Sequence, residues 1–239
     1  MAEWIFVLSI AAAASLSVPT GAALAAVERI RPDWLEEEFR HSIVAFGGGA
    51  LLAAVALVLV PDGMESLPLA AAAACFILGG IAFMLLDRLL ARRKSSASQL
   101  VAMLADFAPE ALALGAVFAA GTGSAPLLAA LIALQNLPES FNAFREIRET
   151  TSTTAVRIVV VFGLIALLGP ACALAGYFLL SDLSAVVGAI MLFSSGGILY
   201  LVFQDIAPQA RLERHWAPPL GAVAGFLMGM IGHGLVGAG

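Results

Sequence analysis

The sequence has few charged residues, since Asp, Glu, Lys and Arg together make up only 12% of its 239 residues. An ordinary soluble domain has roughly 25%. Hydrophobic residues make up 61%, and the mean hydropathy is +0.98. So few polar side chains cannot cover a surface that faces water, and the composition therefore indicates a protein whose main solvent is lipid.

Long apolar runs account for this composition. A helix needs about 20 mostly apolar residues to cross a hydrocarbon core of about 30 Å. Eight runs meet this requirement, near residues 4–26, 42–61, 67–86, 100–120, 125–144, 156–180, 184–206 and 216–237. They lack the alternation of polar and apolar residues that marks barrel strands. We expect an all-α, polytopic membrane protein with eight transmembrane helices in a single domain over residues 1–239.

Cysteine is also scarce, and no basic residue precedes the first apolar run. The two cysteines, Cys75 and Cys172, both lie inside apolar runs, which disfavours a disulfide framework or a cysteine-based metal site. A secretory signal should begin with basic residues, whereas Met1 to Trp4 contains only the acidic Glu3. We therefore expect the first run to be an uncleaved membrane helix.

Basic residues are absent from every second joint between the runs. The joints PDGMESLP, GTGSAP and SDLS contain none. All twelve basic residues follow runs one, three, five and seven: Arg29, Arg31, Arg40, Arg88, Arg92, Arg93, Lys94, Arg145, Arg148, Arg157, Arg211 and Arg214. Cytoplasmic joints carry an excess of Lys and Arg. This segregation predicts an inner, cytoplasmic membrane location with both termini outside.

Three carboxylates lie deep within the apolar runs, where each costs on the order of 2.5–3.5 kcal/mol. They are Asp106, Glu110 and Glu139. The runs LADFAPEALALG and LQNLPESFNAF share one pattern: a polar residue, two others, Pro and Glu. Gln135 thus takes the place of Asp106, and Glu139 that of Glu110. No Lys or Arg in either run could neutralise these acids.

The spacing of this repeat predicts a cation site. Residues four apart share a helix face, and the short joint GTGSAP makes the two helices antiparallel neighbours, so that their polar edges can meet. Pro109 and Pro138 cannot bond to the carbonyls one turn earlier, and such freed carbonyls can help to hold a cation. The alternative is that these polar side chains are hydrogen-bonded glue between helices.

The two Pro-Glu helices, the eight runs and the external termini resemble the ZIP (Zrt/Irt-like protein) family of divalent-metal transporters. In that family the fourth span carries His-Asn-x-Pro-Glu-Gly, and the fifth carries a related motif led by His or Gln. Two segments show weaker similarity to the family: LVPDGMESLP after run two and YLVFQDIAPQA at the end of run seven. The matching positions here are Asp106, Phe107, Ala108, Pro109, Glu110 and Ala111, then Gln135, Asn136, Leu137, Pro138, Glu139 and Ser140.

The resemblance implies a ZIP-like bundle in which Glu110 and Glu139 bind the transported metal, with Asp106, Gln135 and Asn136 as further ligands. The sequence also departs from the family pattern. Phe107 replaces a polar ligand, neither motif contains histidine, and Gly169 stands where the family's sixth span has a glutamate that helps to build a second metal position. These departures argue against a binuclear centre.

The ligand types bear on the identity of the metal. Carboxylate and amide oxygens suit harder ions such as Mn²⁺, Fe²⁺ or Mg²⁺, whereas imidazole favours zinc and its neighbours. Zinc also accepts carboxylate oxygen, so Zn, Mn and Fe all remain candidates. The metal is expected as the transported substrate, and we expect no prosthetic cofactor.

The sequence therefore predicts a membrane transporter, not an enzyme, that moves a divalent cation into the cytoplasm. Two alternatives stay open: a transport-inactive scaffold or metal sensor, and a membrane-embedded hydrolase that uses an acid pair. The expected partners are the cation and the lipid bilayer, with a homodimer left open and nucleic acid not expected. Secondary candidates are Asp62 and His233 near the outer ends of their runs, and Asn142 and Asp205 toward the cytoplasmic side, on an exit path.

Overall fold

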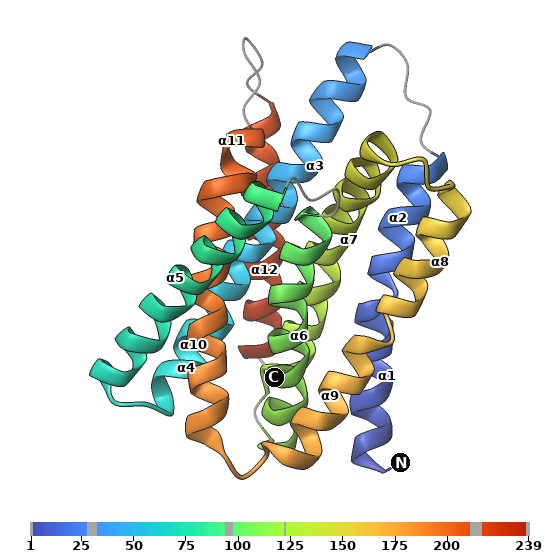
Figure 1. Cartoon of the computed structure of the whole chain (residues 1–239). Coiled ribbons are helices and arrows are strands. Elements are labelled where there is room, and N and C mark those ends of the chain that lie inside the picture. Colours follow the sequence, from blue (N-terminus) through green and yellow to red (C-terminus); the bar gives the residue numbers. More distant parts are fainter. Residues whose placement is uncertain (1, 28–32, 94–97, 122, 211–216, 238–239) are drawn as a thin grey trace.

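The structure is a computed structural model that describes residues 2–27, 33–93, 98–121, 123–210 and 217–237. These residues form a bundle of helices and contain no strand (Figure 1). The helices are α1 (Glu3–Ser15), α2 (Ser17–Val27), α3 (Asp33–Ala54), α4 (Val60–Glu65), α5 (Leu69–Arg93), α6 (Ser98–Ala119), α7 (Ala125–Thr150), α8 (Ala155–Ile165), α9 (Leu168–Leu179), α10 (Ser184–Leu201), α11 (Ala207–Gln209) and α12 (Pro218–Gly237). Two π-helical segments, η1 (Val55–Leu59) and η2 (Val202–Ile206), join α3 to α4 and α10 to α11. The prediction of an all-α fold is confirmed.

Seven helical stretches within the described residues are long and apolar enough to cross a membrane. They are Glu3–Val27, Glu38–Glu65, Leu69–Arg92, Ser98–Ala119, Ala155–Leu179, Ser184–Gln209 and Pro218–Val236. These stretches indicate a multi-pass membrane protein, and each overlaps one of the apolar runs. The remaining run, 125–144, lies in α7, which has 26 residues but does not reach the same hydropathy. Its buried Gln135, Asn136 and Ser140 and the neighbouring Glu139 and Asn142 lower the average.

Two of the seven stretches change to π-helix just before a proline. The N–H of Val60 bonds to the carbonyl of Val55, and the N–H of Ala207 bonds to the carbonyl of Val202, so that each bond spans five residues instead of four. Pro61 and Pro208 follow directly and have no N–H to continue an α-helical ladder. Single π-helical turns of this kind are frequent at functional sites.

These two stretches are related to each other in both sequence and structure. The set Phe46, Gly49, η1 and Pro61 recurs at the same intervals as Phe193, Gly196, η2 and Pro208. The helix α3 begins at the upper end of Figure 1 and runs downward, whereas α10 runs upward. The two stretches therefore form an inverted pair, an arrangement that is typical of secondary transporters.

Glycines allow helices from the two halves of the chain to pack closely, backbone against backbone. A Cβ atom at Gly49 of α3 would lie 2.0 Å from the carbonyl oxygen of Ala222 in α12, and one at Gly225 of α12 would lie 2.0 Å from that of Phe46. The same reciprocal contact joins α5 and α10 through Gly79 and Gly196. Small residues allow helix backbones to approach this closely in membranes. Gly221, Gly225 and Gly229 of α12, spaced four residues apart, all pack on α3.

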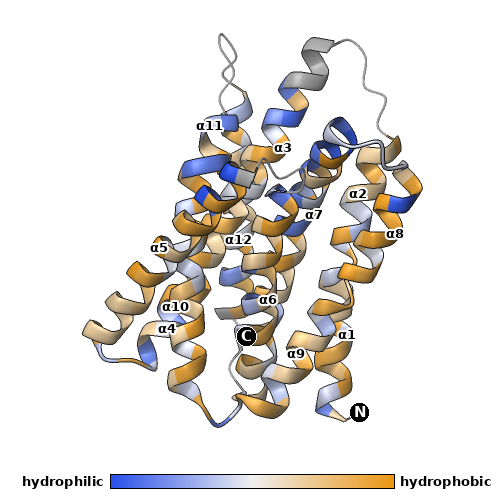
Figure 2. Ribbon diagram, viewed as in Figure 1, coloured by the Kyte–Doolittle hydropathy of each residue, from blue (hydrophilic) through white to orange (hydrophobic). Residues whose placement is uncertain are grey.

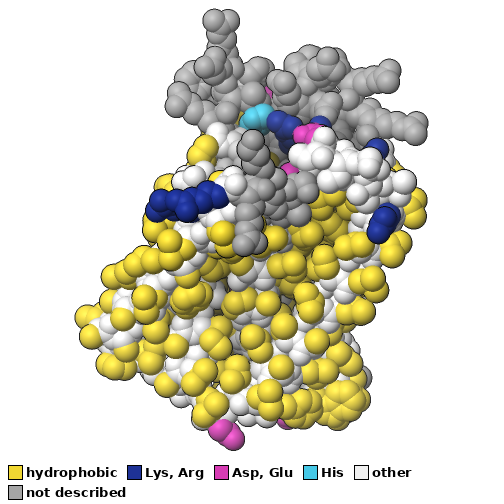
Figure 3. All heavy atoms as spheres, viewed as in Figure 1, with side chains coloured by type: hydrophobic (Ala, Val, Ile, Leu, Met, Phe, Trp, Pro, Cys, Tyr) yellow, Lys and Arg dark blue, Asp and Glu magenta, His cyan; other side chains and the backbone are white. Residues whose placement is uncertain are grey.

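Charge and hydropathy divide the bundle along its length. Apolar residues cover the helices over most of their length, and polar residues gather where α3 begins and α5 and α7 end (Figure 2). The Lys and Arg side chains visible in Figure 3 lie in this upper part, and acidic side chains appear at the lower end. Both termini lie toward the lower end (Figure 1). Arg29, Arg31, Lys94, Arg211 and Arg214 fall outside the described residues.

Candidate functional site

The two Pro-Glu motifs lie side by side in the middle of the bundle. The residues of α6 and α7 contact one another, and Pro109 and Pro138 lie inside these helices. The Gln135 amide Nε2 of α7 donates a hydrogen bond to Glu110 Oε2 of α6. Both side chains are fully buried, with 0% exposure. The polar edges of the two helices therefore face each other, as the spacing predicts.

Unpaired polar atoms are concentrated at this contact. At least one buried side-chain oxygen finds no hydrogen-bond partner within the described part of the chain in each of five residues: Asp106, Glu110, Gln135, Asn136 and Glu139. Unpaired buried polar atoms are rare and costly in folded proteins. The three carboxylates are also close enough to repel one another electrostatically. A cation among them would relieve the repulsion and satisfy these oxygens, so the donor set fits an oxygen-coordinated ion.

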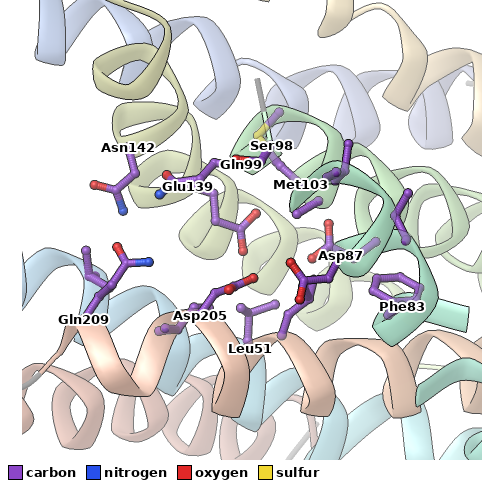
Figure 4. Close-up of a pocket in the computed structure, with 17 residues that line it drawn as sticks. Leu51, Phe83, Asp87, Ser98, Gln99, Met103, Glu139, Asn142, Asp205 and Gln209 are labelled. Atoms are coloured by element: carbon purple, nitrogen blue, oxygen red, sulfur yellow. The ribbon is translucent and has the colours of Figure 1, made fainter. Parts of the chain in front are cut away.

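An open cavity leads to the site from the end at which α3 begins. It has a volume of about 210 Å³. Asp106 and Glu139 line it together with Asp87, Asp205 and Asn142, which come from α5, η2 and α7. Figure 4 shows the side chains of Glu139, Asp87 and Asp205 directed toward the same central space. The expected exit-path residues Asn142 and Asp205 are therefore placed beside the expected ligands.

A second cavity, also of about 210 Å³, continues toward the upper end of the bundle. The two cavities share four lining residues: Val44, Gln99, Asn142 and Gln209. The outer one adds charged side chains, including Arg40, Arg145 and Glu149. On the opposite side of the site, Leu128, Leu131 and Ile132 of α7 are at most 1% exposed and belong to the main apolar core. Access is thus open toward one end and closed toward the other.

The ligand side chains do not converge on a single point. Among the described residues, no three Asp, Glu, His or Cys side chains lie close enough together to hold a metal ion. Glu110 and Gln135 meet directly, whereas Asp106 and Glu139 face the cavity. Binding a cation to all of them would require their side chains to turn inward. The expected metal site of Asp106, Glu110, Gln135, Asn136 and Glu139 stays a prediction.

Phe107 and Gly169 fill the side of α6 that faces α9. Phe107 is 1% exposed, and a Cβ atom at Gly169 would lie 2.7 Å from its ring atom Cζ and 1.9 Å from Ser15 Oγ. A larger side chain at position 169 has no room without movement of α1 or of the Phe107 ring. The described residues thus offer no carboxylate from α9 to the Pro-Glu site, in agreement with the departures seen in the sequence.

Asp62 and His233 lie at the opposite end of the bundle. Asp62 of α4 accepts a hydrogen bond of 2.8 Å from the Ser124 hydroxyl, next to the start of α7. Glu65 and the exposed His233 are its ionisable neighbours. Neither Asp62 nor His233 lines the two cavities described above. They are therefore separate from the Pro-Glu site.

Asp87, Gln99 and Gln209 are functional candidates that the sequence did not indicate. Asp87 lies one residue before Arg88 at the end of an apolar run, which is typical of an ordinary interfacial charge. In the structure it lines the cavity and accepts a hydrogen bond of 3.1 Å from the Tyr200 hydroxyl of α10. The carboxylates of Asp205 and Asp87 lie close enough to interact electrostatically. Only the packing of α5 against α10 brings these two acids together.

No model of a known protein family matches this sequence, and a comparison with curated proteins gives no significant match. The resemblance to the ZIP family therefore depends on the motifs and the arrangement of apolar runs described above.

Proposed function

We propose that this protein carries a divalent metal cation across a membrane, through a site between α6 and α7. The observation that carries this proposal is the set of buried oxygens that find no partner among the described residues, on two adjacent proline-containing helices beside an open cavity. Polar groups this deep in an apolar bundle are expensive to maintain without a ligand. A transported cation would coordinate these oxygens, whereas packing alone leaves them unsatisfied.

We further propose an eighth transmembrane span and an orientation of the bundle in the membrane. The helix α7 serves as an eighth transmembrane span, although Gln135, Asn136 and Glu139 make it less apolar than the other seven. The bundle is ZIP-like, it lies in the cytoplasmic membrane, and the end where α3 begins faces the cytoplasm because the basic joints lie there. Both termini then lie outside. In this orientation the open cavity faces the cytoplasm, and flux is inward.

Alternating access follows from the inverted pair of α3–η1 and α10–η2. If the two halves exchange their arrangements, the cavity beside η2 closes and an equivalent cavity opens beside η1. The helices α6 and α7 carry the ligands and face both halves. Leu131 stands in α7 where Ala102 stands in α6, by the alignment of the Pro-Glu motifs, and would line the second cavity.

The donor set favours a hard divalent cation. Every side-chain donor in the proposed set is a carboxylate or amide oxygen, and the described residues that line the inner cavity include no His or Cys. Such donors suit Mn²⁺, Fe²⁺ or Mg²⁺ better than Zn²⁺, though zinc binds carboxylates as well. Asp87 and Asp205 would receive the ion on its way to the cytoplasm.

Ion flux in proteoliposomes of purified protein tests the proposal. Glu139→Ala removes one carboxylate from the site and should abolish uptake of every divalent ion tested. Asp182→Ala is the control: Asp182 is an exposed acid between α9 and α10 that lines neither cavity, so uptake should persist. Unchanged uptake by Glu139→Ala would contradict the assignment of the site.

One observation favours a second candidate, a metal sensor or scaffold that transports nothing. The described side chains do not converge into a preformed metal cluster. Purified protein of this kind would bind metal without flux, so sustained uptake of Mn²⁺ or Fe²⁺ by the unaltered chain would exclude it.

A further inference from the structure

The two adjacent amides of α7 have different environments, although both are fully buried. Gln135 Nε2 donates to Glu110 Oε2, whereas Gln135 Oε1 and Glu110 Oε1 have no partner among the residues that the structure describes. Neither Nδ2 nor Oδ1 of Asn136 is hydrogen-bonded to any described residue. Gln135 therefore already interacts with an expected ligand across the helix pair, and Asn136 does not.

The bond to Glu110 matters most when no cation is present. A buried carboxylate without a partner is costly, and the described residues of α6 and of α7 as far as Phe144 include no Lys or Arg that could pair with it. A hydrogen bond from an amide N–H to a carboxylate is stronger than one between two neutral groups. It therefore partly replaces the missing cation. Among the described residues, the Gln135 amide is the group that donates to Glu110 in this way.

We propose that the Gln135 amide takes the place of the cation at Glu110 when the site is empty. The empty protein can then return to the conformation that receives the next cation. This inference rests on the transport function proposed above. When a cation enters, Glu110 turns to the ion, and the amide of Gln135 rotates about its soft terminal torsion to present Oε1. Gln135 is thus a positioning residue for the return step as well as a ligand.

The comparison of two fluxes tests this role. Net uptake of Mn²⁺ into empty proteoliposomes requires the empty protein to return, whereas exchange of radioactive Mn²⁺ for internal unlabelled Mn²⁺ requires only the loaded protein. Gln135→Leu removes the N–H donor, so we expect the ratio of net uptake to exchange to fall about tenfold or more. Gln135→His keeps one N–H donor and one acceptor nitrogen and should restore much of the ratio.

Asn136→Leu is the matched control, since Asn136 is an adjacent buried amide without a bond to Glu110. It should lower both fluxes in the same proportion and leave their ratio unchanged. If Gln135→Leu does the same, Gln135 is only a ligand or a packing residue, and the inference is refuted. If the unaltered protein neither takes up nor exchanges Mn²⁺ or Fe²⁺, the proposed function itself fails. Gln135→Met carries the same prediction if Gln135→Leu does not elute as a folded protein.

Discussion

Adding one methyl group to Gly79 should force α5 away from α10. A Cβ atom at this position would lie 1.8 Å from the carbonyl oxygen of Phe193, and backbone cannot turn aside as a side chain can. An ordinary contact needs about 3.4 Å, so the helices must separate locally by about 1.6 Å. Overpacking of this kind costs about 1–3 kcal/mol. The same separation pulls Asp87 from Asp205, which line the inner cavity from α5 and from η2, the segment that directly follows α10.

The neighbouring glycine provides the control. A Cβ atom at Gly80 would lie 3.4 Å from its nearest contact, the carbonyl oxygen of Gly196, so Gly80→Ala should be tolerated. The free energy of unfolding of both variants can be measured by SDS titration in mixed micelles. Their ion uptake can be measured in proteoliposomes. We expect Gly79→Ala to lose stability and uptake while Gly80→Ala keeps both. Equal stability of the two variants would refute the packing of α5 against α10 on which this reasoning depends.

Three further predictions concern the site and its surroundings. Gly169→Ala should cost about 1–3 kcal/mol in the same titration, because the new methyl meets Ser15 Oγ and the Phe107 ring, and Ser15→Ala in the same chain removes the nearer clash and should recover part of the loss. Metal affinity should fall as the pH falls, because carboxylates must lose protons to bind metal, and binding should release protons that an indicator dye detects; affinity independent of pH would contradict carboxylate ligands. In a chain with both native cysteines replaced by serine, Ala102→Cys should react with a polar thiol reagent from the side of the inner cavity, whereas Leu131→Cys should react only from the opposite side. Labelling of both from one side would contradict alternating access.

Much of the fold could be predicted from composition alone, because long apolar runs determine helices that cross a bilayer. The prediction is confirmed for seven of the eight runs. The run 125–144 forms a helix as expected, but its polar residues make it the least clear as a membrane span. The breaks at Leu16 and near Leu167, and the π-helical segments before Pro61 and Pro208, were not predicted, since apolar periodicity does not distinguish a continuous helix from an interrupted one.

The Pro-Glu repeat determined by itself where the polar site lies and which helices carry it. Spacing along a helix fixes which residues share a face, and a short joint fixes which helix is the neighbour. The meeting of Gln135 with Glu110 follows from these local rules. The sequence also indicated, through Phe107 and Gly169, that the site would lack a carboxylate from the sixth run.

Only the tertiary structure decided which distant residues join this site. Asp87 and Asp205 come from opposite halves of the chain, and they reach one cavity because glycines allow α5 and α10 to pack backbone against backbone. The tertiary structure also decided that the cavity opens toward the end where α3 begins and is closed by apolar side chains toward the other. These features depend on how the two inverted halves pack together, and no local pattern in the sequence specifies that arrangement.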